Sequence, residues 1–471
     1  MRYRKKQIIN IFAQNQTVMK KYLALIIGAL TLLPACNKID DEAEGVPVEE
    51  PVVEVPQTSS ETVPNQDVEY GFLSDEAPET LSATENENVL KVNTFAVSAA
   101  RQFGKTVAGN YVFSPVSLAY LLGMLSNGAA GATRDEICAA LGFGAENQQD
   151  INEFCRDLMV LTSRNTTETE VLEIANTCVA DNQFPMIEEY RKDLHNYYDA
   201  LVRNMDFTNK EGVADYINDW ASEHTHGRIK KVVDKVNGVM CLVNGMYFKG
   251  KWATPFVLGP WQEKFIKETG EKLNVDMMHI FLDNGRYYKG KGFQAVTIDY
   301  GKEQPSNYSM SFFLPDKGNG IEWPGFYEGV TVSTMLSNLN GEALSNAITS
   351  SKECLLYIQI PPFEIKMDKS IVYDFKTLGM NTMFEELGAD FSRMTERPAF
   401  VTDVKHVASI KVDENGSEAT AISHADIDYA SDPEPDDEAP KIIYFIADHP
   451  FMFVITENTT GAIMFMGCYR G

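Results

Sequence analysis

The 471-residue sequence predicts an α+β domain behind a long N-terminal extension. Apolar residues recur at helical spacing in some segments, and form continuous or alternating runs suited to strands in others. The two kinds of segment are mixed without strict alternation along the chain, which is typical of the α+β class. Hydrophobic residues make up 44% of the sequence, and this is enough for a large core.

Charge and cysteine usage exclude several classes of function. The formal net charge of −26 argues against binding to nucleic acid or to anionic lipid surfaces, because both require basic patches. No basic run suits heparin. The seven cysteines include no CxxC pair and no zinc spacing, and all except Cys36 are expected to be small core residues.

The chain begins with a secretory signal, assigned to residues 1–35, whose true start is expected at Met19. Two lysines precede an apolar run from Tyr22 to Leu33, which is too short to span a membrane. The ending Leu33-Pro34-Ala35-Cys36 resembles a bacterial lipobox, in which the cysteine carries lipid. An ordinary signal peptide with a chance cysteine is the alternative.

Residues 36–87 form an acidic, proline-rich stretch that is expected to act as an extended tether. The acids that follow Lys38 resemble the surface-export signal of Bacteroidetes lipoproteins. We therefore expect an outer-membrane lipoprotein exposed at the cell surface, bound to the membrane through its lipid only. Packing of residues 70–73 as an N-terminal arm is the alternative for the end of this stretch.

The composition changes at Asn88, where the folded domain is expected to begin. Residues 89–103 carry apolar side chains at helical spacing. Ser114-Pro115 is expected to start a second helix, with proline in its first turn. Thr133 and Glu136 suggest a capping box for a third helix, which Gly142 would end.

The rest of the chain supplies mostly strands. Residues 171–184 and 241–252 are long apolar runs suited to central strands buried on both faces. Pro361-Pro362 is expected to break the ladder of a strand over 355–365 at a sheet edge. Residues 216–236 are expected to form a helix followed by a turn at Gly227, and residues 377–387 another helix. Strand pairs are expected over 293–300 with 308–314 and over 445–454 with 463–467.

Six segments in order resemble the serpins, the serine protease inhibitor superfamily. They are NYVFSPVSLAYLLGMLSNGA (110–129), CLVNGMYFKGKWATPF (241–256), VDMMHI (275–280), MSFFLPD (310–316), VDENGSEATA (412–421) and HPFMFVITENTTGAIMFMG (449–467). The resemblance covers residues 88–471. It implies three β-sheets, about eight or nine helices and an exposed reactive loop.

No motif of the sequence supports catalysis. A nucleophile elbow GxSxG is missing from the sequence. His224 and His226 would lie on different faces of a helix, and no third metal ligand is evident. We expect neither an enzyme nor a bound metal or cofactor.

The serpin resemblance assigns structural roles to several polar residues. It places His406 on the fifth strand of the main sheet, where that sheet opens to admit the loop. Ser114, Ser117 and Asn244 match the other residues of this region, which is called the shutter. Trp252 matches the breach at the top of the same sheet.

Residues 413–431 contain an alternating pattern of small residues. On the pattern alone, a solvated loop with accidental alternation is the preferred interpretation. The resemblance instead makes Glu414 and Gly416 part of a hinge, after which one face of the loop would be buried on insertion. The hinge residues on that face are small: Ser417, Ala419, Ala421 and Ser423.

The implied function is suicide inhibition of serine proteases, with cysteine proteases as a further class. Counting from Glu414 puts the reactive bond at Ala430-Ser431, which suits elastase-like or subtilisin-like enzymes; Tyr429 is the alternative. The acidic stretch 432–440 is longer than usual in the family and leaves this position open by a few residues. The alternative function is a non-inhibitory binding or scaffold protein. We expect a monomer whose partner is the target protease.

Overall fold

The computed structural model describes residues 72–144, 147–303, 305–317, 331–417 and 441–471. The chain divides into two units, Met1–Pro64 and Asn65–Gly471, and every described residue belongs to the second. Among these residues, no helix has both the length and the apolar character needed to cross a bilayer.

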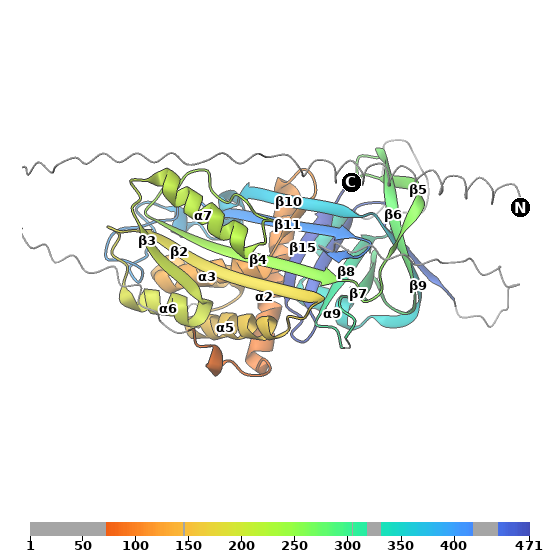
Figure 1. The fold of residues 1–471 in the computed structure, drawn as a ribbon, viewed down its shortest axis with the longest axis horizontal. Coiled ribbons are helices and arrows are strands. Elements are labelled where there is room, and N and C mark those ends of the chain that lie inside the picture. The colour runs from red at the N-terminus through yellow and green to blue at the C-terminus, as the bar shows by residue number, and fades with distance from the viewer. Residues whose placement is uncertain (1–71, 145–146, 304, 318–330, 418–440) are drawn as a thin grey trace, which may run out of the picture. The chain divides into compact units, whose positions relative to one another are not determined.

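The main sheet has six strands in the order β10-β11-β12-β4-β2-β3 (Figure 1). The predicted central strands are confirmed as β2 and β4, which pair antiparallel from Glu170 opposite Gly250 to Ala180 opposite Met240. The bounds of the six strands are β10 Phe363–Ser370, β11 Lys405–Asp413, β12 Gly416–Ser417, β4 Met240–Lys251, β2 Glu170–Asp181 and β3 Ala200–Met205.

The other two of the three predicted sheets form one continuous sheet, because the long strand β6 pairs with strands of both. Strand β6 pairs with β7 over 286–290, and with β9 and β5 over much of its length. The order is β1-β15-β14-β8-β7-β6-β9-β13, with β5 beside β6. The bounds are β1 Tyr111–Phe113, β15 Ile463–Tyr469, β14 Phe451–Glu457, β8 Tyr308–Pro315, β7 Phe293–Asp299, β6 Lys272–Gly290, β9 Lys352–Ile360, β13 Ile443–Ile446 and β5 Val257–Ile266.

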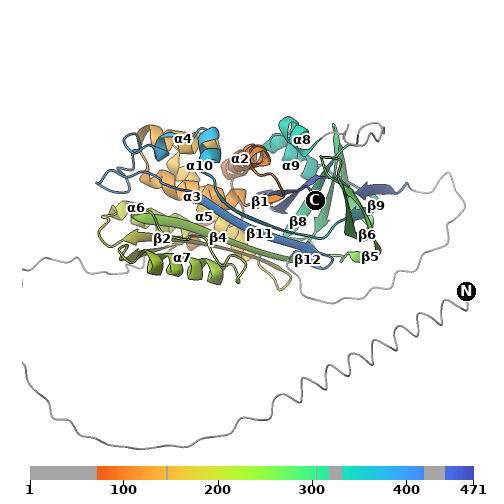
Figure 2. The same cartoon turned by 90° about the horizontal axis from the view of Figure 1, so that it is seen from above.

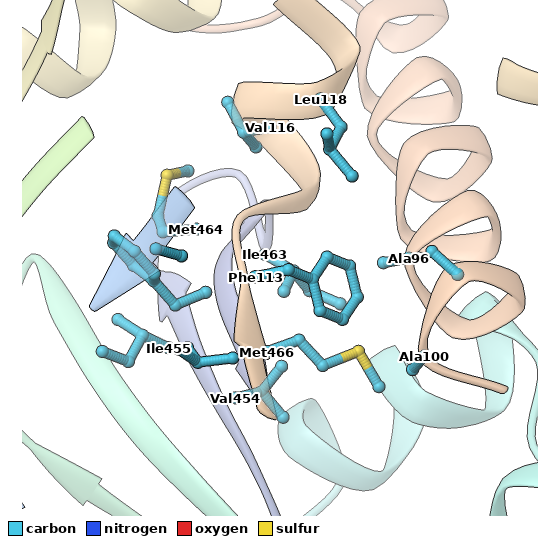
Figure 3. Packing of buried hydrophobic residues seen from close by; sticks show 14 of the residues in the cluster. Ala96, Ala100, Phe113, Val116, Leu118, Val454, Ile455, Ile463, Met464 and Met466 are labelled. Carbon is cyan, nitrogen blue, oxygen red and sulfur yellow. The ribbon is translucent and has the colours of Figure 1, made fainter. Parts of the chain in front are cut away.

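Helices cover both faces of the main sheet. Helix α7 lies on one face, whereas α3 and α5 lie on the other (Figure 2). Side chains of α2, α3, β14 and β15 meet in the core, where Phe113, Val116 and Met466 are buried (Figure 3). The helices of the described residues are α2 Ala83–Thr106, α3 Pro115–Gly128, α4 Gly131–Leu141, α5 Gln148–Arg164, α6 Glu188–Tyr198, α7 Lys210–His224, α8 Val332–Asn338, α9 Gly341–Thr349 and α10 Val372–Thr377, with short 3₁₀ turns η1 Ser74–Glu76 and η2 Thr382–Phe384. The predicted α+β fold is confirmed.

The described fold begins before the boundary expected at residue 88, which lies inside α2. Ser82 caps α2 in a capping box: its hydroxyl accepts from the Glu85 amide, and its own amide donates to the Glu85 carboxylate at 2.7 Å. Upstream of this cap, the Leu73 amide donates to the Asn196 carbonyl at 3.2 Å. Part of the stretch assigned to the tether therefore packs as an arm.

The capping box expected at Thr133 is wrong. Helix α4 begins at Gly131, so Thr133 lies within its first turn, and its hydroxyl accepts from the Asp390 amide at 2.9 Å. The Glu136 carboxylate accepts the Asn381 and Thr382 amides at 2.7 Å. Both side chains form hydrogen bonds with a loop that is distant in the sequence. The spacing of Thr133 and Glu136 therefore serves tertiary contacts and does not form a helix cap.

Other boundaries also differ from the sequence-based expectation. Pro361-Pro362 does not interrupt one strand but connects β9 to β10, which belong to different sheets. The helix expected over 377–387 is wrong, because α10 ends at Thr377 and Gly379 has a φ of 102°. The helix and the turn at Gly227 expected within 216–236 are confirmed, because helix α7 ends at His224 and Gly227 has a φ of 75°. The expected strand over 445–454 is two strands, β13 and β14, which pair with different neighbours.

Candidate functional site

The segment that the serpin resemblance assigns to the hinge lies in the main sheet, between β4 and β11. After β11 the chain turns at Glu414 and Asn415 and returns as β12, in which Ser417 pairs with Val412 on one side and Gly250 on the other. The Trp252 amide donates to the Asn415 carbonyl at 3.0 Å, and the Phe256 amide donates to the Glu414 carbonyl at 2.8 Å. The loop is therefore anchored on both flanks before it leaves the described residues at Ser417.

Gly416 occupies a position that no other residue fits. Its φ is 150°, and a Cβ atom built on it would lie 2.1 Å from the Gly250 carbonyl oxygen. A backbone carbonyl of a paired strand is held in position, whereas a flexible side chain could move away from the added atom. The close approach of β12 to β4 therefore requires glycine at this position.

A buried hydroxyl pair and a stacked tryptophan hold the hinge. The Ser417 side chain is 1% exposed, and its Oγ lies 2.7 Å from the Tyr300 hydroxyl. Burial raises the pKa of Tyr300, so its hydroxyl stays protonated. Trp252 stacks on Tyr300 with ring centroids 4.5 Å apart, and its indole N–H donates to the Asp413 carbonyl at 2.9 Å.

The sequence does not predict a role for Tyr300. Tyr300 ends the apolar segment 293–300, and nothing in that segment distinguishes it from a core aromatic. Only the register of β12 brings Ser417 to its hydroxyl.

The four residues assigned to the shutter lie where α3 meets the main sheet, with His406 on β11 and Asn244 on β4. The His406 Nε2 accepts the Ser114 amide at 3.4 Å, and the Ser114 hydroxyl accepts the Ser117 amide at 3.0 Å as the N-cap of α3. The Ser117 hydroxyl donates to the Asn244 side-chain oxygen. The Asn244 amide group then donates to Asn176 at 2.8 Å, which continues the network into β2.

His406 is held in its neutral form. Its side chain is buried against α3, and this burial lowers its pKa to about 4. A neutral imidazole can accept the Ser114 amide, whereas a protonated one cannot. The network therefore depends on the uncharged histidine.

Strands β4 and β11 border a cavity at the ends far from the hinge. Within the described residues they pair with β12 and not with each other. This cavity, of about 410 Å³, is bordered by residues 240–245 of β4 and 405–407 of β11. Residues of β4, β11 and α3 line it, among them Leu242, Asn244, Val407 and Leu118.

The other groups considered for chemistry do not converge. The His224 Nδ1 lies 2.8 Å from the Trp220 carbonyl oxygen, and the His226 Nε2 lies 2.8 Å from the Glu173 carboxylate. Throughout the described part of the chain, no three potential metal ligands cluster. None of the six cysteines there is in a disulfide, and burial raises the pKa of Cys241 and Cys468 to about 12.

Several predicted site residues lie outside the described residues, and the structure leaves their roles as predictions. They are Cys36, Ala419, Ala421, Ser423, Tyr429, Ala430 and Ser431.

The fold and this hinge define a protein of the serpin type, whose members generally inhibit proteases or bind other molecules. The chain belongs to the serpin family: the sequence model described as serpin (serine protease inhibitor) matches residues 90–470. It is 29% identical to intracellular coagulation inhibitor 2 of Tachypleus tridentatus over 80% of this chain and 90% of that one.

Two solved structures have the same fold. The thermophilic serpin tengpin in its native state superimposes with a TM-score of 0.71 and 23% identity, covering 85% of this chain and 99% of that one. Thyroxine-binding globulin in complex with thyroxine gives a TM-score of 0.67 and 24% identity, covering 81% of this chain and 98% of that one.

Proposed function

We propose that the protein is a suicide inhibitor of serine proteases, with elastase-like or subtilisin-like enzymes as the favoured targets. The observation that carries the proposal is Ser417, which is buried between β4 and β11 where both strands pair with β12; farther from the hinge the same two strands border a cavity of about 410 Å³. It needs no cofactor or heparin and acts as a monomer.

The register of β12 specifies how the rest of the loop would enter. Each step of two residues beyond Ser417 moves two residues back along β4 and along β11. Ala419 would then lie between Phe248 and Ile410. Ala421 would lie between Met246 and Ala408. Small side chains on this face avoid the overpacking that costs about 1–3 kcal/mol per site.

The same register brings Ser423 to the shutter. Ser423 would lie between Asn244 on β4 and His406 on β11. Its hydroxyl can donate one hydrogen bond and accept others, so it can join the existing polar network. A polar seam of this kind lets the two strands exchange hydrogen bonds with an incoming strand.

Inhibition then requires that the loop inserts faster than water hydrolyses the acyl-enzyme. The protease serine attacks the carbonyl carbon of the reactive residue, proposed as Ala430, and forms an acyl-enzyme while the amine of the next residue leaves. Insertion from Ser417 to Ala430 would carry the bound protease about 45 Å along the sheet. Displacement and distortion of the protease before water attacks the ester traps the complex.

The test is a denaturing gel of the protein mixed with elastase-type and subtilisin-type proteases. We expect a covalent complex that survives denaturation, and mass spectrometry should find the ester at Ala430. Ser417→Arg should give cleavage without a complex, because an arginine cannot be buried beside Tyr300. Ser417→Thr, which keeps the hydroxyl, is the matched control and should retain the complex.

Cleavage without a covalent complex by every protease of a broad panel would favour the alternative of a non-inhibitory binding or scaffold protein. Thyroxine-binding globulin, which shares the fold, was solved with bound thyroxine.

A further inference from the structure

The cavity beside β4 and β11 has mostly apolar walls, which come from several elements. Helix α3 contributes Leu121 and Leu125, and the connection from α7 to β4 contributes Val236. Phe391 and Met394, from the segment that precedes β11, complete the walls. The volume of about 410 Å³ lies within the range of about 300–1,000 Å³ that is usual for small-molecule sites, which are likewise mostly apolar with a few polar groups.

The cavity reaches the protein surface at the end of β4 that is far from the hinge. Val239 and Phe400 line the cavity, and they are 47% and 39% exposed. The four steps along β4 from Met240, near this opening, to Asn244 at the shutter span about 13 Å. The cavity therefore has an apolar entrance at one end and the polar shutter at the other.

The shutter end of the cavity contains a buried hydrogen-bond donor that lacks an acceptor. The Nε2 atom of His406 accepts the Ser114 amide, so the proton of the neutral ring lies on Nδ1. His406 lines the cavity and is 7% exposed, and Nδ1 forms no hydrogen bond with the part of the chain that the structure describes. A buried donor without a partner is costly, so an acceptor atom of a ligand would be stabilised here.

The charges around the cavity favour an uncharged ligand. The shutter residues at its inner end are a neutral histidine, hydroxyls and an amide, so they offer no cation to a carboxylate, and burial of an unpaired charge is costly. At the opening, Lys235 and Lys405 are accompanied by Asp403, and the Lys405 ammonium lies 2.8 Å from the Asp368 carboxylate. Neither end therefore selects an anion.

We propose that the cavity binds an uncharged, apolar small molecule whose inner end carries a carbonyl oxygen, and that this oxygen accepts the hydrogen bond of the His406 Nδ1–H group. Binding itself does not depend on the inhibitory function. One consequence does rest on that function: the ligand would occupy space between β4 and β11 that an inserted strand requires, so the loaded protein should trap less protease.

The test is a fluorescence titration of the intact protein with prodan, an uncharged naphthyl ketone whose emission shifts to the blue in apolar surroundings. We expect saturable binding of one molecule per chain. His406→Phe should raise the dissociation constant about tenfold, because a phenyl ring has a similar shape but donates no hydrogen bond. His406→Gln, whose side-chain amide can donate, should remain within about threefold of the parent.

A second variant tests the cavity without altering the histidine. Leu242 lines the cavity and is half-buried, so Leu242→Trp should fill part of the space and raise the dissociation constant at least about tenfold. The matched control is Leu258→Trp on β5 of the second sheet, where the leucine is 48% exposed, and it should leave the dissociation constant unchanged. Thermal unfolding verifies that each variant is folded.

Competition with prodan tests the class of ligand. A straight-chain methyl ketone should displace prodan, and the fatty acid of equal chain length should do so about tenfold less well, because its carboxylate would be buried without a cation. Three results would overturn the inference: prodan binding that does not saturate, equal displacement by the ketone and the acid, or a dissociation constant that neither His406→Phe nor Leu242→Trp changes.

The effect on inhibition is measured separately. Saturation with prodan should reduce the yield of covalent complex with an active elastase-type protease, and an unchanged yield would show that the ligand and the loop do not compete. If no covalent complex forms with any protease, with or without prodan, the inhibitory function fails while the binding site stands.

Discussion

At the scale of single residues, Ser423 is the side chain whose replacement should affect insertion most specifically. The register of β12 would bring it between Asn244 and His406, where a valine, which has the size of threonine but no hydroxyl, would leave polar groups without a new partner. We expect Ser423→Val to slow insertion, so that more inhibitor is cleaved for each protease trapped. Titration of protease activity should give a stoichiometry of inhibition raised severalfold. Ser423→Thr should stay close to the parent, and an equal stoichiometry for Val and Thr would contradict this role.

His406 should make stability depend on pH in a defined window. Its pKa in the folded protein is lowered to about 4 by burial, below the usual 6.5, so the unfolded chain takes up the proton first as pH falls. The stability that the neutral imidazole provides is complete above pH 6.5 and is lost between pH 6.5 and pH 4. The loss approaches about 3 kcal/mol.

Comparison with His406→Gln isolates this effect. Burial raises the pKa of Asp157 and Asp193 to about 6, and these groups act in the opposite direction in both proteins. Urea unfolding at several pH values should give two curves that converge as the pH falls from 6.5 to 4. Parallel curves would show that His406 does not titrate with a lowered pKa.

At the scale of elements, the slot between β4 and β11 predicts a large effect of loop cleavage on stability. A strand that fills the slot would form backbone hydrogen bonds on both sides, each contributing about 1 kcal/mol, and would occupy the cavity of about 410 Å³. Cleavage of the loop by a protease that is not trapped should therefore raise the Tm on the order of 10 °C. Calorimetry before and after cleavage checks this, with Ser417→Arg as a control that should gain little. A cleaved protein of unchanged Tm would mean that the loop stays out.

Some of these strands, turns and caps could be predicted from the sequence, whereas others could not. The long apolar runs of β2 and β4 are visible in the sequence because both faces of these strands are buried. The sequence cannot show that Pro361-Pro362 joins two strands, because proline blocks a ladder equally well within a strand and between two strands. Thr133 and Glu136 have the spacing of a cap but bind a loop more than two hundred residues away.

In the candidate site, too, some residues could be predicted from the sequence and others could not. Gly416 and Ser417 were visible as a hinge because of the serpin resemblance, and Ser114 is a local helix cap that proline at the next position signals. The contacts of Tyr300 with Ser417 and Trp252 depend on the register of three strands. Register is a property of the assembled sheet, so no local sequence pattern predicts it.

At the scale of the whole molecule, we propose that lipid on Cys36 anchors the protein at a membrane surface and that the acidic tether holds the domain away from it. Cys36→Ala should release the protein into the aqueous phase of a detergent partition, because the protein would lose its acyl chains. Cys354→Ala, which replaces an unpaired cysteine of the folded domain, should stay with the membrane. Retention of Cys36→Ala at the membrane would rule out the lipid anchor.

The central claim is that the loop becomes a strand between β4 and β11 when a protease is trapped, and hydrogen exchange measures this most directly. In the trapped complex, the amides of residues 418–427 should exchange orders of magnitude more slowly than in the free protein, since they would be paired on both sides. The parts of β4 and β11 that border the cavity should gain protection together with them. Fast exchange of residues 418–427 in a complex that survives denaturation would contradict insertion and require another way of holding the protease.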